Sequence, residues 1–473
     1  MRAGEFSIGI LQGLHQLGVF TNIDVISSVS GGGYAASWLY VQSLNNDFNE
    51  DSLFDDNRKY QKYLTTHGEL VSHFAATTGI LRQSGYVAKI IENGAAIPVN
   101  AFANGLFGWH ANTVPGRRMY EEGIDRLFDV VPRAEGRRSD LDVVGFRDFS
   151  TFINMPRHLT FEGIASSNIQ GRLPFPIVNT TAHIDAAPPE DAGLLQNRVF
   201  EFTPLHYGND YFGYFNTNYP FDYNRAIAVS GGAFDSKLIR DPNKSLLASI
   251  FNYDLGYSIN NPDAIRSHRY PFDPLPLPFY LFDGHYQKDI NGDRIYLSDG
   301  GHSENFGAYS LIRRLCKTII IVDDEYDETN DLFDAYWKLK RALRGEMGVD
   351  FSVTNIDQGL CSLYNQPKPV MNGTISYFPV LNATNGIEQR TINVIYILLS
   401  MNTNQLRSYP GVIKDYYKRT RGKSSGGQLS EFPMESTRDL SYYPEQVLAY
   451  HELGNYIVTN NANYFSQVGE TKK

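Results

Sequence analysis

The stretch that decides the fold is Val25-Ile-Ser-Ser-Val-Ser-Gly-Gly-Gly-Tyr34, where an apolar run ends in a serine and three glycines. A sharp strand-to-helix turn that exposes a nucleophilic serine needs very small residues two positions before and after that serine. Ser28 and Gly32 occupy these positions around Ser30, so the pattern is Ser-x-Ser-x-Gly rather than Gly-x-Ser-x-Gly. The stretch therefore predicts a nucleophile elbow at Ser30. The alternative is an ordinary glycine-rich turn that binds an anion at a helix N-terminus.

The segments around the elbow predict an α/β fold. Apolar residues at helical spacing predict a helix over 4–18 with Gly18 as its stop, and β-branched residues predict a buried strand over 23–29. A helix over 35–44 completes the order helix, strand, elbow, helix, which is typical of a parallel α/β sheet. We expect later strands at 173–182, 198–203, 317–324 and 391–399, a strand-rich region that includes the apolar run 225–234, and a last helix at 442–458.

Composition and charge narrow the functional classes. The chain has 473 residues, of which 42% are hydrophobic and 20% charged, so it can bury a large core. Its net charge of −10 argues against nucleic acid as the main partner. The two cysteines, Cys316 and Cys361, form neither a disulfide framework nor a metal-binding C-x-x-C motif. No uncharged apolar stretch is long enough to cross a membrane, and we see no signal peptide.

A second chemical motif lies far downstream, in Leu297-Ser-Asp-Gly-Gly-His-Ser-Glu-Asn-Phe-Gly307. Here an apolar strand ends in Asp299, and two glycines allow a tight turn. Open α/β sheets place their sites at strand ends, so Asp299 is the candidate base for Ser30. A plain turn is the alternative for Asp299 alone. His302 is the alternative base, in a conventional triad.

The two motifs together resemble the patatin-like phospholipase family, including its cytosolic phospholipase A2 branch. Shorter stretches add to the resemblance: Ile8–Leu14, Asn179–Thr181, Ala226–Ala233 and Phe432–Thr437. The similar parts cover 2–40, roughly 170–325, and 390–455. The resemblance implies a three-layer α/β/α fold with a central, mostly parallel sheet. It also implies one catalytic domain over 1–473, with a helical and loop insertion at about 45–165 that could cover the site.

The resemblance also implies the chemistry. Ser30 would be the nucleophile and Asp299 its general base, in a Ser-Asp dyad that hydrolyses carboxylic esters of phospholipids or lysophospholipids through an acyl-enzyme. No metal or cofactor is expected, and the partner would be a lipid ester rather than nucleic acid. Peripheral membrane contact is compatible with this interpretation. A cytoplasmic or membrane-peripheral location is favoured, while an upstream targeting signal stays open.

The residues expected to support the oxyanion are Gly31, Gly32, Gly300, Gly301 and Arg2. The family's oxyanion loop has the form Gly-Gly-Gly-x-Arg, and Arg2 matches its arginine. The loop glycines would lie before Met1. We therefore expect Met1 to be an internal methionine of a natural protein that begins further upstream. The alternative is a catalytically impaired protein that binds lipid or acts as a scaffold, because losing one oxyanion donor typically costs about 10²–10³ in rate.

Overall fold

The computed structural model describes the two ends of the chain and most of its second half. The described residues are 2–45, 160–168, 173–184, 194–195, 197–216, 219, 222–232, 256–262, 294–326, 333–360, 368–377, 380–382, 386–388, 391–425, 428–429, 431–435, 444–466 and 468. The insertion expected at about 45–165 therefore lies almost wholly outside the described residues.

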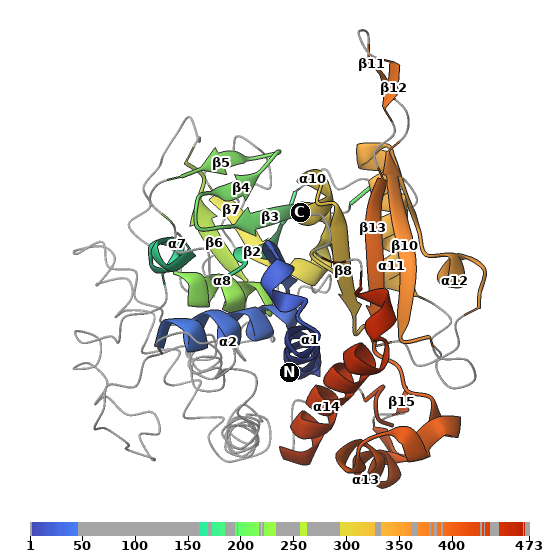
Figure 1. Cartoon of the computed structure of the whole chain (residues 1–473). Helices are drawn as coiled ribbons and strands as arrows, with labels where there is room; N and C mark the ends of the chain where they lie inside the picture. Colours follow the sequence, from blue (N-terminus) through green and yellow to red (C-terminus); the bar gives the residue numbers. More distant parts are fainter. Residues whose placement is uncertain are drawn as a thin grey trace, which may run out of the picture.

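One mixed sheet of seven strands carries both sequence motifs (Figure 1). Its strands are β1 (Val25–Val29), β2 (Phe175–Ala182), β3 (Arg198–Phe202), β4 (Tyr207–Asn209), β5 (Gly213–Phe215), β6 (Tyr257–Asn260) and β7 (Arg294–Ser298). The order is β5-β4-β3-β2-β7-β6, and β1 also pairs with β2. β2 is thus the strand that joins the two halves of the sheet.

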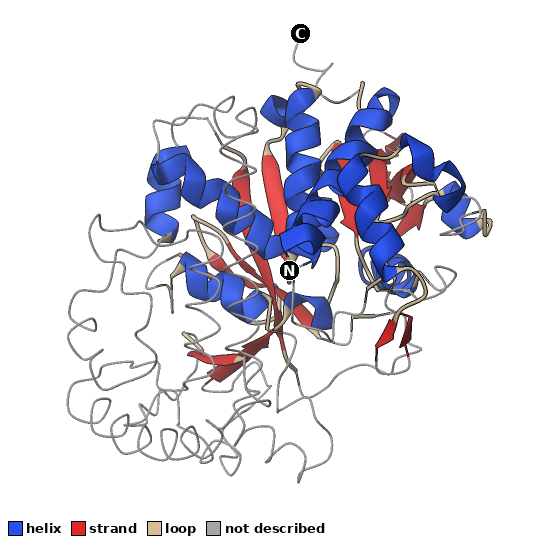
Figure 2. Cartoon of the chain, turned by 90° about the horizontal axis from the view of Figure 1, so that it is seen from below, coloured by secondary structure: helices blue, strands red, loops and turns tan. Residues whose placement is uncertain are grey.

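Within the described part of the chain, two helices pack on β1 and β2 over the apolar face of this sheet. They are α2 (Gly32–Asn45), which begins directly after the elbow, and α8 (Tyr223–Ser230). Trp38 of α2 and Ile227 of α8 are buried with Val178 of β2 and Leu297 of β7 in one hydrophobic cluster. Figure 2, in which helices are blue and strands are red, shows helices packed beside the strands of the molecule. Alternating strand residues supply this core, because successive side chains of a strand point to opposite faces.

A second sheet has four strands and helices on both faces. Its order is β8-β13-β10-β9, formed by β8 (Thr318–Asp323), β13 (Thr391–Leu398), β10 (Val370–Tyr377) and β9 (Val349–Ser352). Side chains of α10 (Ala308–Arg313), α11 (Asp334–Met347) and α12 (Thr354–Asp357) pack on one face. The other face contacts α1 (Arg2–Gln16), α13 (Gly411–Thr420) and α14 (Pro444–Asn460). This half of the molecule has the three α/β/α layers expected.

The remaining described elements are short. They are α7 (Phe161–Asn168), β11 (Val380–Asn382), β12 (Gly386–Glu388), β14 (Ser424–Ser425), β15 (Gln428–Leu429), η1 (Phe20–Asn22), η6 (Gly300–His302), η7 (Thr403–Ser408) and η8 (Ala462–Tyr464). Within the described part of the chain, no helix is long and apolar enough to cross a membrane.

The structure confirms the α/β fold and changes two details of it. Among the described strands, the parallel pairs are β1–β2 and β8–β13, and the other pairs are antiparallel. The sheets are therefore less parallel than expected. The apolar run 225–234, placed in the strand-rich region, begins instead as helix α8, with the Asp222 carboxylate accepting a hydrogen bond from Arg225 N at its N-terminus.

Helix α1 lies between the two halves and packs closely against α14. Its Ile8 belongs to the core of the first sheet, whereas Phe6 belongs to a core of the second. The close approach depends on glycine, because a Cβ on Gly9 would overlap the carbonyl oxygen of His451. A Cβ on Gly454 would likewise overlap the carbonyl oxygen of Phe6. Small residues let the two helix backbones touch, which sets the position of α1.

Gly9→Ala should lower the free energy of unfolding by about 1–3 kcal/mol, because the added methyl forces α1 away from α14. Equilibrium denaturant unfolding measures the change. The matched control is Gly411→Ala in α13, where the methyl would meet open space. The control should be neutral or slightly stabilising. Equal stability of the Gly9 variant and the wild type would contradict the described packing.

Candidate active site

Ser30 has the strained backbone that a nucleophile elbow requires. Its φ is 47°, in the left-handed region that a residue with a Cβ adopts at a cost of about 1–2 kcal/mol. The turn leads from β1 directly into α2. The next residue approaches α1 so closely that a Cβ on Gly31 would lie 2.7 Å from Ala3 Cβ. The serine hydroxyl is thus held at a sharp turn between a buried strand and a helix.

The strand pairing brings Ser30 to Asp299. β1 runs parallel to β2 and ends at the pair Val29–Asn179. β7 runs antiparallel along the same edge of β2 and ends at the pair Ser298–Thr181. The two strands therefore approach each other head-on, and the residue that follows each of them meets the other. Ser30 Oγ donates a hydrogen bond to Asp299 Oδ2 at 3.0 Å.

Asp299 is a buried carboxyl group with few polar neighbours. Its side chain is almost completely shielded from solvent, and its Oδ1 accepts a hydrogen bond of 2.7 Å from Gly301 N. Burial raises the pKa of Asp299 to about 7, although the hydrogen bonds from Gly301 and Ser30 act in the opposite direction. The group is therefore a much stronger base than an exposed aspartate, and it still ionises near neutral pH.

The turn after Asp299 is fixed against β2. Thr181 Oγ1 lies 2.7 Å from Asp299 O, 3.1 Å from Gly300 O and 3.0 Å from Ser303 Oγ. A Cβ on Gly300 would overlap the carbonyl oxygen of Asn179, so the turn can sit this close to the sheet only with glycine there. These contacts set the direction in which the Asp299 carboxylate points.

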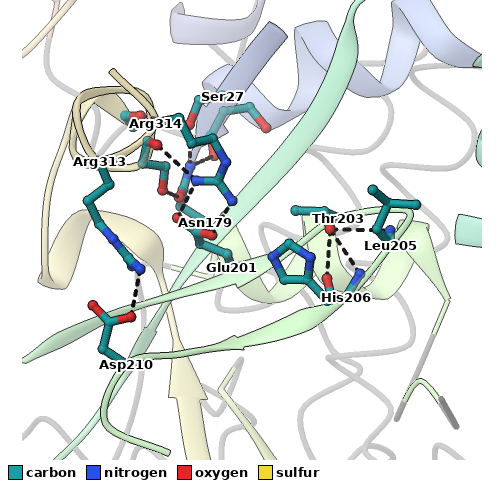
Figure 3. A network of polar contacts seen from close by, with 12 residues as sticks. Ser27, Asn179, Glu201, Thr203, Leu205, His206, Asp210, Arg313 and Arg314 are labelled. Carbon is teal, nitrogen blue, oxygen red and sulfur yellow. Dashed lines mark hydrogen bonds and ion pairs between the residues drawn. The ribbon is translucent and has the colours of Figure 1, made fainter. Parts of the chain in front are cut away.

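The elbow is held on its other side by Asn179, two residues earlier in β2 (Figure 3). Its amide nitrogen lies 2.8 Å from Ser27 Oγ and 2.9 Å from Ser28 O. Its amide oxygen accepts a hydrogen bond of 2.6 Å from Ser310 Oγ of α10. Asn179 therefore links the end of β1, just before the nucleophile, to helix α10.

An ion pair next to Asn179 anchors the end of α10. Arg314 donates to both carboxylate oxygens of Glu201, at 2.9 and 2.7 Å, and Figure 3 shows the two groups facing each other. Glu201 lies opposite Asn179 in the β2–β3 pairing, so both project from the same face. Burial raises the pKa of Glu201, but the hydrogen bonds and charge of Arg314 outweigh burial, and the net pKa is lowered. The fully buried carboxylate thus keeps its charge.

His302 lies beside the site but contacts neither member of the pair through its ring. Its Nδ1 lies 2.9 Å from Ser298 Oγ, which also lies 2.6 Å from His183 Nε2. Burial lowers the pKa of His302, so its ring is neutral at pH 7. Among the described residues, no histidine ring contacts the Ser30 side chain. This arrangement gives no support to a triad through His302.

The other predicted site residues fall into two groups. Gly31 and Gly32 begin α2 next to Ser30, and among the described residues neither backbone N–H has an acceptor. Arg2 lies in the first turn of α1 and is buried, but its guanidinium donates to the backbone oxygens of Glu435, at 2.8 Å, and Asp324. Arg2 therefore ties α1 to the chain before α14 and to the end of β8.

Sequence reasoning missed the roles of Asn179 and Thr181. Their stretch contributed to the family resemblance, yet nothing in it pointed to a function. The available signal was polar residues inside an apolar strand, since Asn179 and Thr181 are buried and need hydrogen-bond partners. Among the described residues, no cluster of side chains could hold a metal ion.

Asp299→Asn should stabilise the protein relative to wild type by an amount that grows as the pH rises from about 4 to about 7. The folded protein keeps a proton on Asp299 up to a pKa of about 7, whereas the unfolded carboxyl loses it near 3.8. The ionisation of Asp299 therefore lowers the stability of wild type across this window, and the amide variant lacks that contribution. Unfolding free energies at several pH values measure the difference.

The control for this prediction is Asp415→Asn, which changes an exposed carboxylate of α13. Its effect on stability should be small, because an exposed ion pair contributes little. A constant difference between Asp299→Asn and wild type across the same window would contradict the raised pKa.

Comparison with known proteins supports the fold. The sequence matches no protein-family model and no curated protein. A similar solved structure is human GIVD cytosolic phospholipase A2, with 13% sequence identity and a TM-score of 0.54. The match covers 99% of this chain and 60% of that one, so the chain spans about three-fifths of its length. At this identity the likeness shows the α/β fold.

Proposed function

We propose that the protein is a serine acyl hydrolase that cleaves carboxylic esters of lipids. The observation that carries this proposal is the 3.0 Å hydrogen bond from Ser30 Oγ to the buried carboxylate of Asp299. A serine hydroxyl is a weak nucleophile until a neighbouring base accepts its proton. Asp299 meets that need, because its pKa of about 7 brings its basicity close to neutral pH.

The first half of the reaction transfers the acyl group to the enzyme. Ser30 Oγ attacks the ester carbonyl carbon while its proton passes to Asp299 Oδ2. The carbonyl oxygen becomes negatively charged, and the backbone N–H groups of Gly31 and Gly32 are the donors beside it. When the tetrahedral intermediate collapses, the ester C–O bond breaks and Asp299 returns the proton to the leaving alcohol. The product is an acyl-Ser30 ester.

The second half releases the acid. Asp299, again ionised, takes a proton from water, and the hydroxide attacks the acyl carbonyl. Collapse of this intermediate breaks the bond to Ser30 Oγ, which recovers its proton from Asp299. No histidine, metal or cofactor takes part in either half. A catalytic domain that spans the whole chain, with an insertion at about 45–165, is part of the same proposal.

The choice of lipid as substrate has two supports. The Ser30 and Asp299 motifs resemble those of patatin-like phospholipases, and the fold is similar to that of a structure named cytosolic phospholipase A2. We therefore place phospholipids or lysophospholipids as the substrate class, met at a membrane surface. The proposal assigns no role to nucleic acid.

Ser30→Ala should reduce hydrolysis by at least about 10³-fold, and Asp299→Asn by about 10²–10⁴-fold, because the first lacks the nucleophile and the second the base. The full natural chain is assayed against p-nitrophenyl butyrate and against a fluorescent phospholipid in vesicles. Loss of both activities in both variants supports a lipid acyl hydrolase. Persistent activity in either variant would contradict the dyad.

His302→Gln is the discriminating variant in the same assay. The proposed dyad predicts a loss of less than about tenfold, since the His302 ring binds Ser298 rather than Ser30. A loss as large as that of Ser30→Ala would instead support a catalytic triad with His302 as the base. Activity on the soluble ester without activity on the vesicles would contradict the lipid substrate class.

A further inference from the structure

The end of helix α8 reaches the nucleophile from the opposite side to Asp299. Ser230, the last residue of α8, is fully buried, and its Oγ accepts a hydrogen bond of 2.9 Å from Ser30 N. The same hydroxyl donates a hydrogen bond of 2.6 Å to Asn179 O. A serine hydroxyl has one proton, so donating to Asn179 leaves its lone pairs facing the Ser30 amide. The Ser230 hydroxyl therefore acts as a donor to Asn179 O and as an acceptor from Ser30 N.

This contact acts on the dihedral angle that aims the nucleophile. The φ angle of Ser30 is the rotation about its N–Cα bond, so it sets the direction of the Cα–Cβ bond relative to the peptide plane that carries the N–H. Holding that N–H on Ser230 therefore holds the φ of 47°. The strained value needs such support, because surrounding contacts must fix a left-handed serine in place.

The anchor of Ser230 is the same residue that holds the elbow from the other side. Asn179 binds Ser28 O through its side chain and Ser230 through its backbone oxygen. The pairing of β2 with β7 begins two residues further on, where Thr181 holds the Asp299 turn. The positions of Ser30 and Asp299 are thus both set by one short piece of β2.

The contact also determines which backbone amides of the elbow can donate a hydrogen bond to the substrate. The Ser30 N–H is occupied by Ser230 and is not free to bind a developing negative oxygen. Among the described residues, the N–H groups of Gly31 and Gly32 have no acceptor. The Ser30 amide therefore positions the nucleophile, whereas the amides of Gly31 and Gly32 remain available to donate to the oxyanion.

We propose that Ser230 is a positioning residue for the reaction, which aims the Ser30 hydroxyl at Asp299 by holding the Ser30 amide. The proposal rests on the proposed acyl hydrolase function. Ser230 touches neither the substrate nor Asp299, so its effect passes entirely through the orientation of Ser30. Its loss should slow the chemical step and leave ester binding unchanged.

The test compares Ser230→Ala, Ser230→Thr and Ser37→Ala in the full natural chain with p-nitrophenyl butyrate as the probe. Ser230→Ala should lower kcat by about 10- to 100-fold, because displacing a nucleophile by about 1 Å lowers the rate by about 10²-fold. KM should stay within about twofold. Ser230→Thr keeps the hydroxyl and should recover most of kcat.

Ser37→Ala is the matched control, because it makes the same side-chain change at a buried hydroxyl of α2 that has no partner among the described residues. It should leave kcat unchanged. The pH profile is the readout that a merely structural effect would move. Loosening the site would hydrate Asp299 and shift the midpoint of the profile to lower pH, whereas loss of aim alone weakens the Ser30 hydrogen bond that lowers this pKa and moves the midpoint, if at all, to higher pH.

The outcomes separate the two proposals. An active wild type whose Ser230→Ala variant keeps its kcat overturns the role of Ser230 and leaves the hydrolase function standing. So does a variant in which kcat falls together with a midpoint shifted to lower pH. A wild-type chain that hydrolyses no ester overturns the hydrolase function and this inference with it. Reduced kcat, constant KM, a midpoint that does not move to lower pH and rescue by threonine support the inference.

Discussion

The head-on meeting of β1 and β7 along one edge of β2 is the constraint on which the site depends. Ser30 and Asp299 are 269 residues apart in the chain, and their contact is a consequence of where these two strands end. The strand ends pair with Asn179 and Thr181, which are two residues apart in β2. Asn179 then binds the end of β1, just before Ser30, and Thr181 binds the turn that follows β7. One short segment of backbone therefore sets both the distance and the direction of the candidate reacting groups.

The arrangement costs stability in two places. A left-handed serine costs about 1–2 kcal/mol. The buried carboxyl costs more, because a pKa raised from 3.8 to about 7 corresponds to roughly 4 kcal/mol at and above neutral pH. Burial of Asp299 is thus the larger of the two costs, and it is also what makes this carboxylate basic enough to accept the serine proton. The large cores on the faces of the two sheets offset both costs.

Sequence patterns were sufficient for the elements that carry a local signal. Small residues around Ser30 and glycines after Asp299 predicted the two turns, and apolar spacing predicted α1, β1, β8, β13 and α14. Strand direction was not predictable from local patterns, since it depends on which strands pair, and the paired strands lie far apart in the chain. Ser230 carried no local signal either. Its hydroxyl matters because α8, within a run first placed among strands, ends beside the elbow. The catalytic roles of Ser30 and Asp299 stay predictions.

The central claim is that the Asp299 carboxylate activates the Ser30 hydroxyl, and covalent labelling by a fluorophosphonate tests it most directly. The labelled residue is located by peptide mass spectrometry, and the labelling rate is followed from about pH 5 to about pH 9 in wild type and in Asp299→Asn. The account predicts a label on Ser30 whose rate rises with pH to a plateau above a midpoint of about 7, and loss of that dependence in the variant. An unlabelled Ser30, or labelling that is independent of both pH and Asp299, would contradict it.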